Sequence, residues 1–300
     1  MKQPRICIFG EVLFDHFPDG KRVLGGAPFN VAWHLQAFGL APRFISRVGA
    51  DAEGSSVLDA MRDWGMDTQS VQVDERLPTG RVSVSIVDNE PAYDIVADCA
   101  YDAIEPAPPP LPPDALLYHG SLAIRAADSR ATLDALSRQT VSGSIFLDVN
   151  LRPPWWDRQT VMARVRAADW VKLNCAELDL LAPDQIGSST QAQDFLAVNN
   201  LQGLIVTLGA EGAQAFTKDG SSYLARPGGD VAIVDTVGAG DAFTAVTILG
   251  ITSGWPLSLT LERAQLFASQ IVGQRGATVS DPAFYRPLLA AWEINATTGE

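Results

Sequence analysis

The chain has 300 residues, of which 47% are hydrophobic and 19% charged, a composition typical of globular proteins and not of disordered ones. Its net charge of −13 argues against partners such as nucleic acid or an anionic membrane surface. The three cysteines lie far apart without a CxxC pair, so neither a disulfide framework nor a structural zinc site is expected. No apolar run is long enough to span a membrane, and the first residues lead directly into a strand without a signal peptide, so we expect a cytoplasmic protein.

Apolar runs and helical spacing alternate along most of the chain, which predicts strands that alternate with helices. The expected strands are 5–9, 44–48, 71–73, 116–118, 145–150, 170–173 and 204–207, with a hairpin at 214–216 and 221–224. The expected helices are 28–39, 56–64, 129–138, 160–168 and a last helix at about 261–272. This order favours an α/β fold with a mostly parallel central sheet flanked by helices.

One early stretch differs in kind. Thr79–Val87 alternates apolar and polar residues, turns at Asp88–Asn89 and returns through Tyr93–Val96, which predicts an antiparallel hairpin with one wet face. We therefore expect one α/β domain over residues 1–300, with a small antiparallel lid formed by about 15–25 and 79–104. The exposed face of such a sheet is either a ligand cover or a dimer surface.

Polar residues follow several predicted strands, at the ends where open α/β sheets bind their ligands. Asp15 comes just past the first strand, and the end of the strand 145–150 carries Asp148, Asn150 and Arg152. Asn30 projects from the first turn of a helix beside a glycine pair, which suits either hydroxyl binding or local backbone bonding. His34, on the same helix, is expected on the helix surface or satisfied in the core.

Asn174 and Glu177 open a further helix. Their spacing is that of a capping box, in which each side chain bonds the backbone N–H of the other residue. On this local pattern alone, capping is a better explanation than chemistry.

The stretch Asp235–Phe243 reads DTVGAGDAF and precedes an apolar, helix-like run. Gly238 and Gly240 allow a turn whose N–H groups point outward at the positive end of a helix dipole, which is an anion site suited to phosphate. Asp241 is unexpected there. It either takes a proton from a hydroxyl that attacks a phosphoryl group, or it is simply an acid at a helix N-terminus. Neither a GxxxxGK[ST] loop nor a GxGxxG turn after the first strand is present, which argues against P-loop enzymes and dinucleotide dehydrogenases.

Taken together, four motifs resemble the ribokinase-type (PfkB) sugar kinase family. They are GGAPFNVAWHLQAFG at 25–39, NCAE at 174–177, TLGAEG at 207–212 and DTVGAGDAF at 235–243, in family order over nearly the whole chain. The stretches TGRVSV, YHGSLAIR and DVNLRPPWW look most like bacterial fructokinases. The resemblance implies an ATP-dependent, ribokinase-like kinase acting on a small sugar, with fructose as the first expectation.

The resemblance also implies a role for each matching residue. Asp241 would be the base, and Gly238, Ala239 and Gly240 would offer N–H groups to the phosphoryl group. The sugar would be held by Asp15, Gly25, Gly26, Asn30, Tyr93, Tyr101 and Arg152. Asn174 and Glu177 would organise Mg²⁺ through water near the ATP phosphates, and Thr207, Gly209 and Gly212 would line the nucleotide. Asp235 would bind a monovalent cation such as K⁺, although Val237 replaces a residue that often carries a hydroxyl.

Other functions stay open at this point. Relatives phosphorylate ribose, ketodeoxygluconate or nucleosides, and a few pocket contacts decide between them. A binding protein without catalysis could keep the same fold, but the intact Asp241 argues against that class. The alternating strands of the lid also predict a homodimer joined lid to lid.

Overall fold

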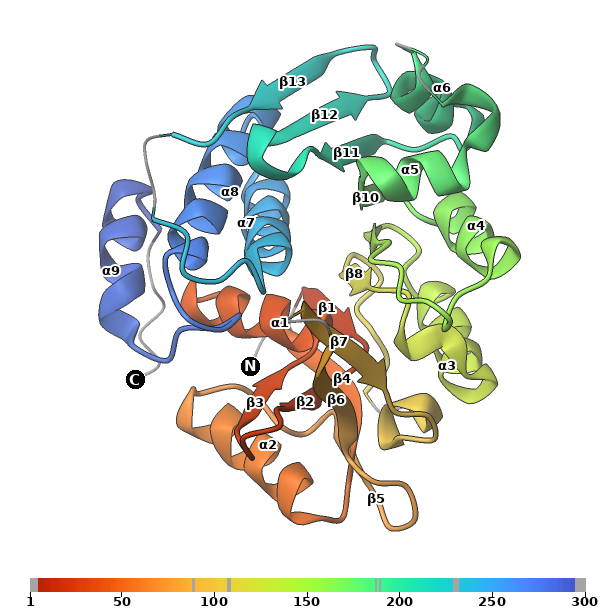
Figure 1. The fold of residues 1–300 in the computed structure, drawn as a ribbon. Coiled ribbons are helices and arrows are strands. Elements are labelled where there is room, and N and C mark those ends of the chain that lie inside the picture. Colours follow the sequence, from red (N-terminus) through yellow and green to blue (C-terminus); the bar gives the residue numbers. More distant parts are fainter. Residues whose placement is uncertain are drawn as a thin grey trace.

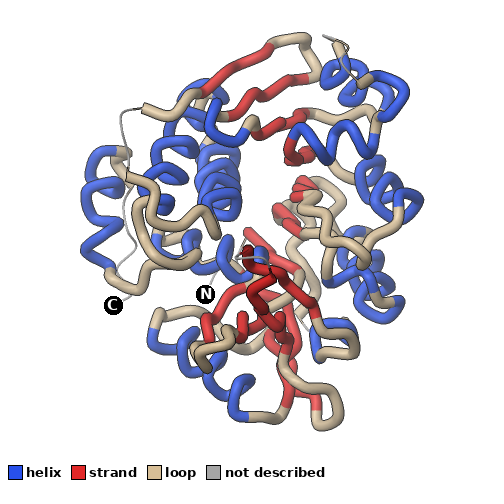
Figure 2. Tube along the Cα trace, in the orientation of Figure 1, coloured by secondary structure: helices blue, strands red, loops and turns tan. Residues whose placement is uncertain are grey.

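The computed structural model describes residues 5–87, 90–106, 109–186, 188, 190–228 and 232–294. A nine-stranded sheet crosses the molecule, and a second sheet of four strands stands beside one end of it (Figures 1 and 2). The larger sheet has the order β13-β12-β11-β10-β9-β8-β1-β4-β5. Its strands run parallel from β11 to β5, and only β12 and β13 are antiparallel. The predicted α/β architecture is therefore confirmed.

The strands of the large sheet are short and nearly all buried, as expected when helices cover both faces. In sheet order they are β13 (Ser222–Ala225), β12 (Ala213–Thr217), β11 (Gly203–Thr207), β10 (Trp170–Asn174), β9 (Ser144–Asp148), β8 (Leu116–His119), β1 (Ile6–Phe9), β4 (Arg43–Gly49) and β5 (Val71–Asp74).

The helices divide between the two faces of the large sheet (Figure 1). On one face lie α1 (Ala27–Ala37), α2 (Ala52–Asp63), α7 (Ala239–Ser253), α8 (Leu257–Val272) and α9 (Pro282–Ala291). On the other lie α3 (Ala127–Ser137), α4 (Arg158–Ala167), α5 (Cys175–Leu181) and α6 (Gln191–Val198). Each face of the sheet has its own hydrophobic core, and the side chains of β1 alternate between the two. Ile6 and Ile8 pack in the first core, and Cys7 and Phe9 pack in the second.

The smaller sheet has the order β3-β2-β6-β7 and contains the predicted lid hairpin. Its strands are β2 (Leu13–His16), β3 (Arg22–Gly25), β6 (Gly80–Val87) and β7 (Glu90–Ile95), while the expected turn at Asp88–Asn89 lies outside the described residues. Both hairpins are antiparallel, and a parallel pairing of β2 with β6 joins them. Val82 and Val84 are buried while residues 81, 83 and 85 are exposed, which confirms the predicted wet face.

The last helix of the described chain was not predicted. The helix predicted at 261–272 is not the last one, because α9 follows it, with Asp281 as its N-cap and Pro282 in its first turn. Asp15 lies within β2 of the smaller sheet, just past the first strand and in the part of the chain expected to form the lid. Within the described ranges, no helix is both long and apolar enough to cross a bilayer.

Candidate active site

The DTVGAGDAF stretch forms the N-terminus of α7, with Gly238 as N-cap. Gly238 has φ +83°, and a Cβ there would lie 2.4 Å from the Cα of Ala277, so only glycine fits. No side chain caps this helix end. The amide of Ala239 donates a long bond of 3.4 Å to Thr236 O, and the next amides belong to Gly240 and Asp241 at the positive end of the helix dipole. The geometry is that of the expected anion site.

A second helix brings its N-terminus to the same place. Asn30 lies in the first turn of α1, and its Nδ2 donates to Asp241 Oδ2 over 2.8 Å although 211 residues separate the two. Gly26 is the N-cap of α1 with φ +110°, and a Cβ there would lie 2.7 Å from the carbonyl oxygen of Glu11. The glycine pair therefore packs against the chain that leaves β1, and Asn30 is placed directly at the carboxylate.

The surroundings of Asp241 raise its pKa to about 6. Burial is the largest cause, because it disfavours the charged form. The bond from Asn30 opposes this effect, the neighbouring Asp148 adds to it, and the positive charges of Lys172 and Arg152 lower the pKa. A carboxylate with a pKa near 6 is ionised at neutral pH and is still a stronger base than an ordinary aspartate, which suits general-base chemistry.

A buried ion pair lies beneath the turn. Lys172 Nζ contacts both carboxylate oxygens of Asp148, at 3.0 and 2.8 Å. Thr244 Oγ1, one turn into α7, bonds both Asp148 Oδ2 and the carbonyl of Gly240, at 2.9 Å each. Lys172 Nζ is also 3.6 Å from the position that a Cβ on Gly240 would occupy. The pair thus anchors the first turn of α7 to β9 and β10.

The residues expected on the sugar side are brought together in part. Asp15 is half-buried, which raises its pKa, and Arg152 stands close enough to lower the pKa of Asp15 as well as that of Asp241. Gly25 ends β3 and is buried beside Asn30. Tyr93 on β7 is 55% exposed and makes no recorded contact with these described residues.

Tyr101 is different, because it is completely buried in the 3₁₀ turn Ala100–Ala103 that follows the lid. A Cβ on Gly80 of β6 would lie 2.7 Å from its ring. Tyr101 lies in the predicted lid region and packs against the lid strand β6 as a fixed wall.

The residues expected on the nucleotide side lie at the ends of β10 and β11. Asn174 and Glu177 form the capping box, since Glu177 N–H donates to Asn174 Oδ1 and Asn174 N–H to Glu177 Oε2, both at 2.9 Å. Glu177 Oε1 accepts from the Leu151 amide at 2.7 Å, directly before Arg152. Thr207 stands opposite Asn174 in the sheet register. Glu177 therefore joins the two sides of the site.

The loop after β11 needs both of its glycines. Gly209 has φ +61° and Gly212 φ +103°, and a Cβ on Gly212 would lie 2.0 Å from Ala225 O. Gly209 is exposed with open space around it, so a ligand can approach the backbone closely there.

Asp235 and Glu177 are the two acidic residues expected to act on metal ions. Asp235 uses its oxygens within the chain, accepting from the amides of Val237 at 3.0 Å and Gly276 at 3.1 Å. Glu177 has backbone donors on both oxygens, so it fits Mg²⁺ through water better than as a direct ligand. Across the ranges the structure describes, no group of three or more His, Cys, Asp or Glu residues could hold a metal ion.

Comparison with known families gives this arrangement its context. Residues 4–283 match the pfkB family carbohydrate kinases. The chain belongs to this family. It is a carbohydrate kinase, and it is 32% identical to a fructokinase of Klebsiella pneumoniae over 294 residues, covering 91% of this chain and 93% of the relative. A fructokinase-2 of Oryza sativa is 27% identical over 282 residues, covering 83% and 80% of the two chains.

Solved structures agree on the fold of this pfkB kinase. A fructokinase from Xylella fastidiosa with bound ATP superposes with a TM-score of 0.82 at 22% identity, covering 97% of this chain and 99% of the other. A Vibrio cholerae fructokinase with fructose, ADP and potassium ion bound gives 0.79 at 26% identity, covering 94% and 97%. An aminoimidazole riboside kinase from Salmonella enterica gives 0.81 at 24% identity, covering 95% and 99%.

Sequence reasoning missed three polar residues of this kinase site. Glu11 follows β1 and is 4% exposed, Tyr118 on β8 is fully buried, and Lys172 lies within β10. Glu11 had a usable signal, since it stands just past the carboxyl end of a strand, as Asp148 does. Lys172 also had a signal in the sequence, because it lies in an otherwise apolar strand and lysine is rarely buried unless it is paired.

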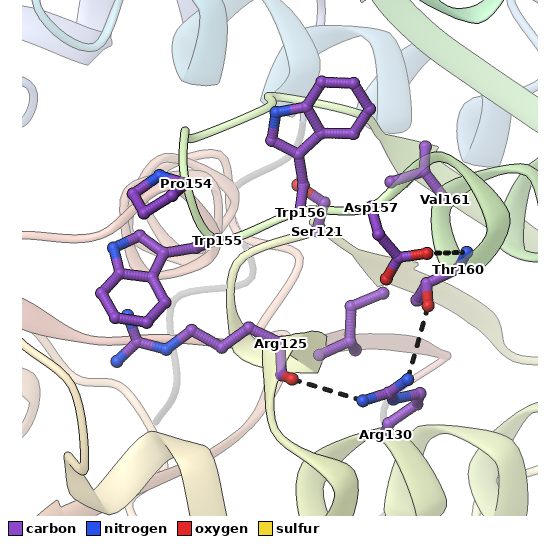
Figure 3. A pocket seen from close by; sticks show the side chains of 10 residues that line it. Ser121, Arg125, Arg130, Pro154, Trp155, Trp156, Asp157, Thr160 and Val161 are labelled. Atoms are coloured by element: carbon purple, nitrogen blue, oxygen red, sulfur yellow. Dashed lines mark hydrogen bonds between the residues drawn. The ribbon is translucent and has the colours of Figure 1, made fainter.

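A cavity of about 260 Å³ lies to one side of these residues, between the DVNLRPPWW loop and the segment after β8 (Figure 3). Trp155, Trp156, Arg125 and Arg130 line it, whereas Asp241 and Asn30 do not. Arg125 lies 4.4 Å from the Trp155 ring centre and bonds both carboxylate oxygens of Asp102. These contacts make the cavity wall a rigid support behind Tyr101, which lies 5.0 Å from the same guanidinium.

Proposed function

We propose that this carbohydrate kinase transfers the γ-phosphoryl group of ATP to a hydroxyl of fructose, with Asp241 as the general base. One observation carries the assignment of the base: Asp241 lies at the uncapped N-terminus of α7, bonded to Asn30 and with a pKa of about 6. Fructose is favoured because the relatives of this chain include fructokinases, and because a Vibrio cholerae fructokinase of similar fold holds fructose.

In this mechanism Asp241 removes the proton from the attacking sugar hydroxyl, the oxygen bonds to the γ-phosphorus, and the bond to the leaving ADP oxygen breaks. The amides of Gly238, Ala239 and Gly240 and the helix dipole stabilise the charge on the transferring group. Lys172 adds a fixed positive charge beneath the turn. Asn30 orients the carboxylate, and the backbone beside Gly25 and Gly26 lets the sugar approach closely.

The remaining expected residues take proposed positions around this centre. Asp15 and Arg152 are proposed to bind further sugar hydroxyls, and Tyr93 and Tyr101 to close the pocket from the lid side. Thr207, Gly209 and Gly212 are proposed to line ATP. Asn174 and Glu177 are proposed to hold Mg²⁺ through water, which when bound neutralises phosphate charge. Asp235 is proposed to bind K⁺ while its carboxylate also accepts hydrogen bonds from the amides of Val237 and Gly276.

Three further proposals concern the whole molecule. We propose one domain over 1–300 whose smaller sheet closes over the sugar. We propose a homodimer through that sheet, which a monomeric mass by light scattering would contradict. Because its proposed co-substrate is ATP, we also propose that it acts in the cytoplasm.

The test is ADP release, with Mg²⁺ and ATP, on fructose, ribose, ketodeoxygluconate, adenosine and aminoimidazole riboside. Fructose-dependent release that disappears in Asp241→Asn supports the proposal. Faster turnover of another acceptor would replace fructose and keep the base. An Asp241→Asn variant with near-normal turnover would remove Asp241 from its role.

A further inference from the structure

Several buried polar atoms have no hydrogen-bond partner in the described part of the chain, and four of them concern this site. An unpaired polar atom is unfavourable in a protein interior, so a group of them indicates a place where a ligand or water completes the bonding. The four are Glu11 Oε2, Asn30 Oδ1, Tyr101 OH and Tyr118 OH.

Charge interactions place these groups around Glu11. Its carboxylate interacts with Asp241 and Arg152. The hydroxyls of Tyr101 and Tyr118 are each affected by the charge of Glu11. Asn30 enters the group through its bond to Asp241. The unpaired atoms therefore belong to groups that bond to Asp241 or interact electrostatically with it or with Glu11, and they come from α1, β8, the segment after β1 and the 3₁₀ turn Ala100–Ala103.

Glu11 cannot easily turn away from this position. Its backbone is wedged against Gly26, where a Cβ would meet its carbonyl oxygen at 2.7 Å, and the preceding Gly10 leaves no room for a side chain beside Pro28. The amides of Glu11 itself and of Ala123 bond its carboxylate, which leaves Oε2 free. A buried acid that is held in this way and still has an open oxygen is suited to a ligand.

The charge balance shows which ligand fits. The positive charge of Arg152 lowers the pKa of three carboxyl groups, those of Glu11, Asp15 and Asp241, and is therefore shared among them. Lys172 is already paired with Asp148. An anionic sugar acid would meet an excess of carboxyl groups, whereas sugar hydroxyls can donate to carboxyl oxygens and accept from tyrosine hydroxyls.

We propose that Glu11, flanked by Tyr101 and Tyr118, binds a hydroxyl of the sugar and selects uncharged sugars over sugar acids. The inference rests on the proposed sugar kinase function and assigns a specificity-determining residue to it. Burial raises the pKa of Glu11 to about 7, so near neutral pH the carboxyl group can either accept or donate a hydrogen bond. Arg125 lies against the ring of Trp155 (Figure 3). Its guanidinium is also 5.0 Å from the centre of the Tyr101 ring, and these two contacts keep this wall fixed.

The test compares Glu11→Ala, Glu11→Gln and Tyr118→Phe with the unaltered kinase. Sugar binding is measured by calorimetry without ATP, and kcat and KM are measured for both substrates. Glu11→Ala should weaken sugar binding and raise the sugar KM about 10- to 100-fold, the range for a hydrogen bond to a charged group, while the ATP KM changes less than twofold. Glu11→Gln should lose the pH dependence of sugar affinity near pH 7 and discriminate less between fructose and ketodeoxygluconate.

Tyr118→Phe separates binding from folding, because the hydroxyl it removes has no hydrogen-bond partner among the residues that the structure describes. It should weaken sugar binding severalfold without lowering Tm. Asp74→Asn is the matched control, since Asp74 is a buried acid paired with Arg47 at 2.8 Å in β5. It should lower Tm and leave sugar affinity unchanged.

Each outcome decides between the two proposals. If the unaltered kinase turns over fructose while the Glu11 variants keep its sugar affinity and pH dependence, the role of Glu11 is wrong and the kinase assignment stands. If the sugar binds, Glu11→Ala weakens it and ATP is not consumed, the kinase assignment fails and Glu11 stays a sugar ligand. Equal losses for both substrates in Glu11→Ala with a lowered Tm, and none in Tyr118→Phe, would make Glu11 structural. Tighter binding of the sugar acid than of fructose would also overturn the proposal.

Discussion

Asp241→Asn should make the kinase more stable while it disables the chemistry. The pKa of Asp241 rises from an ordinary 3.8 to about 6, mainly because the carboxylate is buried. One pKa unit corresponds to about 1.4 kcal/mol, so the ionised carboxylate lowers the free energy of unfolding at neutral pH by up to ~3 kcal/mol. Because Asp241 keeps some exposure to solvent, we expect a gain of about 1–3 kcal/mol when asparagine removes the charge.

The pH dependence of that gain has a definite sign. A carboxyl group whose pKa is raised in the folded state favours folding below its unfolded pKa, and this contribution is lost as the pH rises through the folded pKa. The stabilities of Asp241→Asn and of the unaltered kinase should therefore converge near pH 4 and diverge up to about pH 6. Above that pH the difference should be constant, with a Tm several degrees higher in the variant.

The assay is thermal unfolding from pH 4 to 8, together with turnover at pH 8. Turnover should fall about 10²- to 10⁴-fold, the usual contribution of a general base. Asp59→Asn, which alters an aspartate that is 69% exposed on α2, should change stability by less than about 0.5 kcal/mol. A stability gain equally large at pH 4 and pH 8, or no gain at all, would refute the burial argument.

Three further substitutions test the supports of the site. Gly238→Ala places a Cβ 2.4 Å from backbone at φ +83°, so urea unfolding should show a loss of about 2 kcal/mol or more. Lys172→Met leaves Asp148 buried and unpaired, which should cost about 3–5 kcal/mol by the same assay. Asn30→Leu removes the bond that lowers the pKa of Asp241, so the acid limb of the kcat/KM profile should move above pH 6.

Each of these has an outcome that would contradict it. An unchanged urea midpoint in Gly238→Ala would mean that the backbone at Ala277 can move to accept the added Cβ without a loss of stability. If Lys172→Met is not rescued by adding Asp148→Leu, the loss does not come from an unpaired charge. An acid limb that stays in place in Asn30→Leu, with the fold intact, would show that another group governs the base.

The elements that the sequence predicted well are those whose signal is local. Buried strands such as β1 and β11 are short apolar runs, and the start of α7 follows from a glycine turn before an apolar helix. The parallel pairing of β2 with β6 has no such signal, because it joins segments over 60 residues apart and depends on the whole fold. The start of α9 did have one in Asp281 and Pro282, but Pro287 inside the helix obscured it.

The site residues likewise fall into those that a local motif predicts and those that depend on distant partners. The motifs located Asp241 and Asn30 separately, but only the folded chain shows that 211 residues between them close into a 2.8 Å bond. Lys172 shows why other site residues were not predicted. In the sequence it is simply one residue of the strand β10. Its role depends on Asp148 in the neighbouring strand and on Thr244 of α7, which bonds the same carboxylate. When the role of a residue is set by partners on other elements, the sequence around that residue gives little indication of it.

The resulting site balances opposing effects on one proton. Burial alone would push the pKa of Asp241 up until the group was protonated at neutral pH and useless as a base. Asn30, Lys172 and Arg152 hold it near 6, while the buried Asp148 that fixes Lys172 in place works against them. Lys172, which lowers the pKa of Asp241, and Asp148, which raises it, together anchor the helix turn that presents the carboxylate. A change in the charge of Lys172 or Asp148 should therefore alter both the position and the base strength of the Asp241 carboxylate.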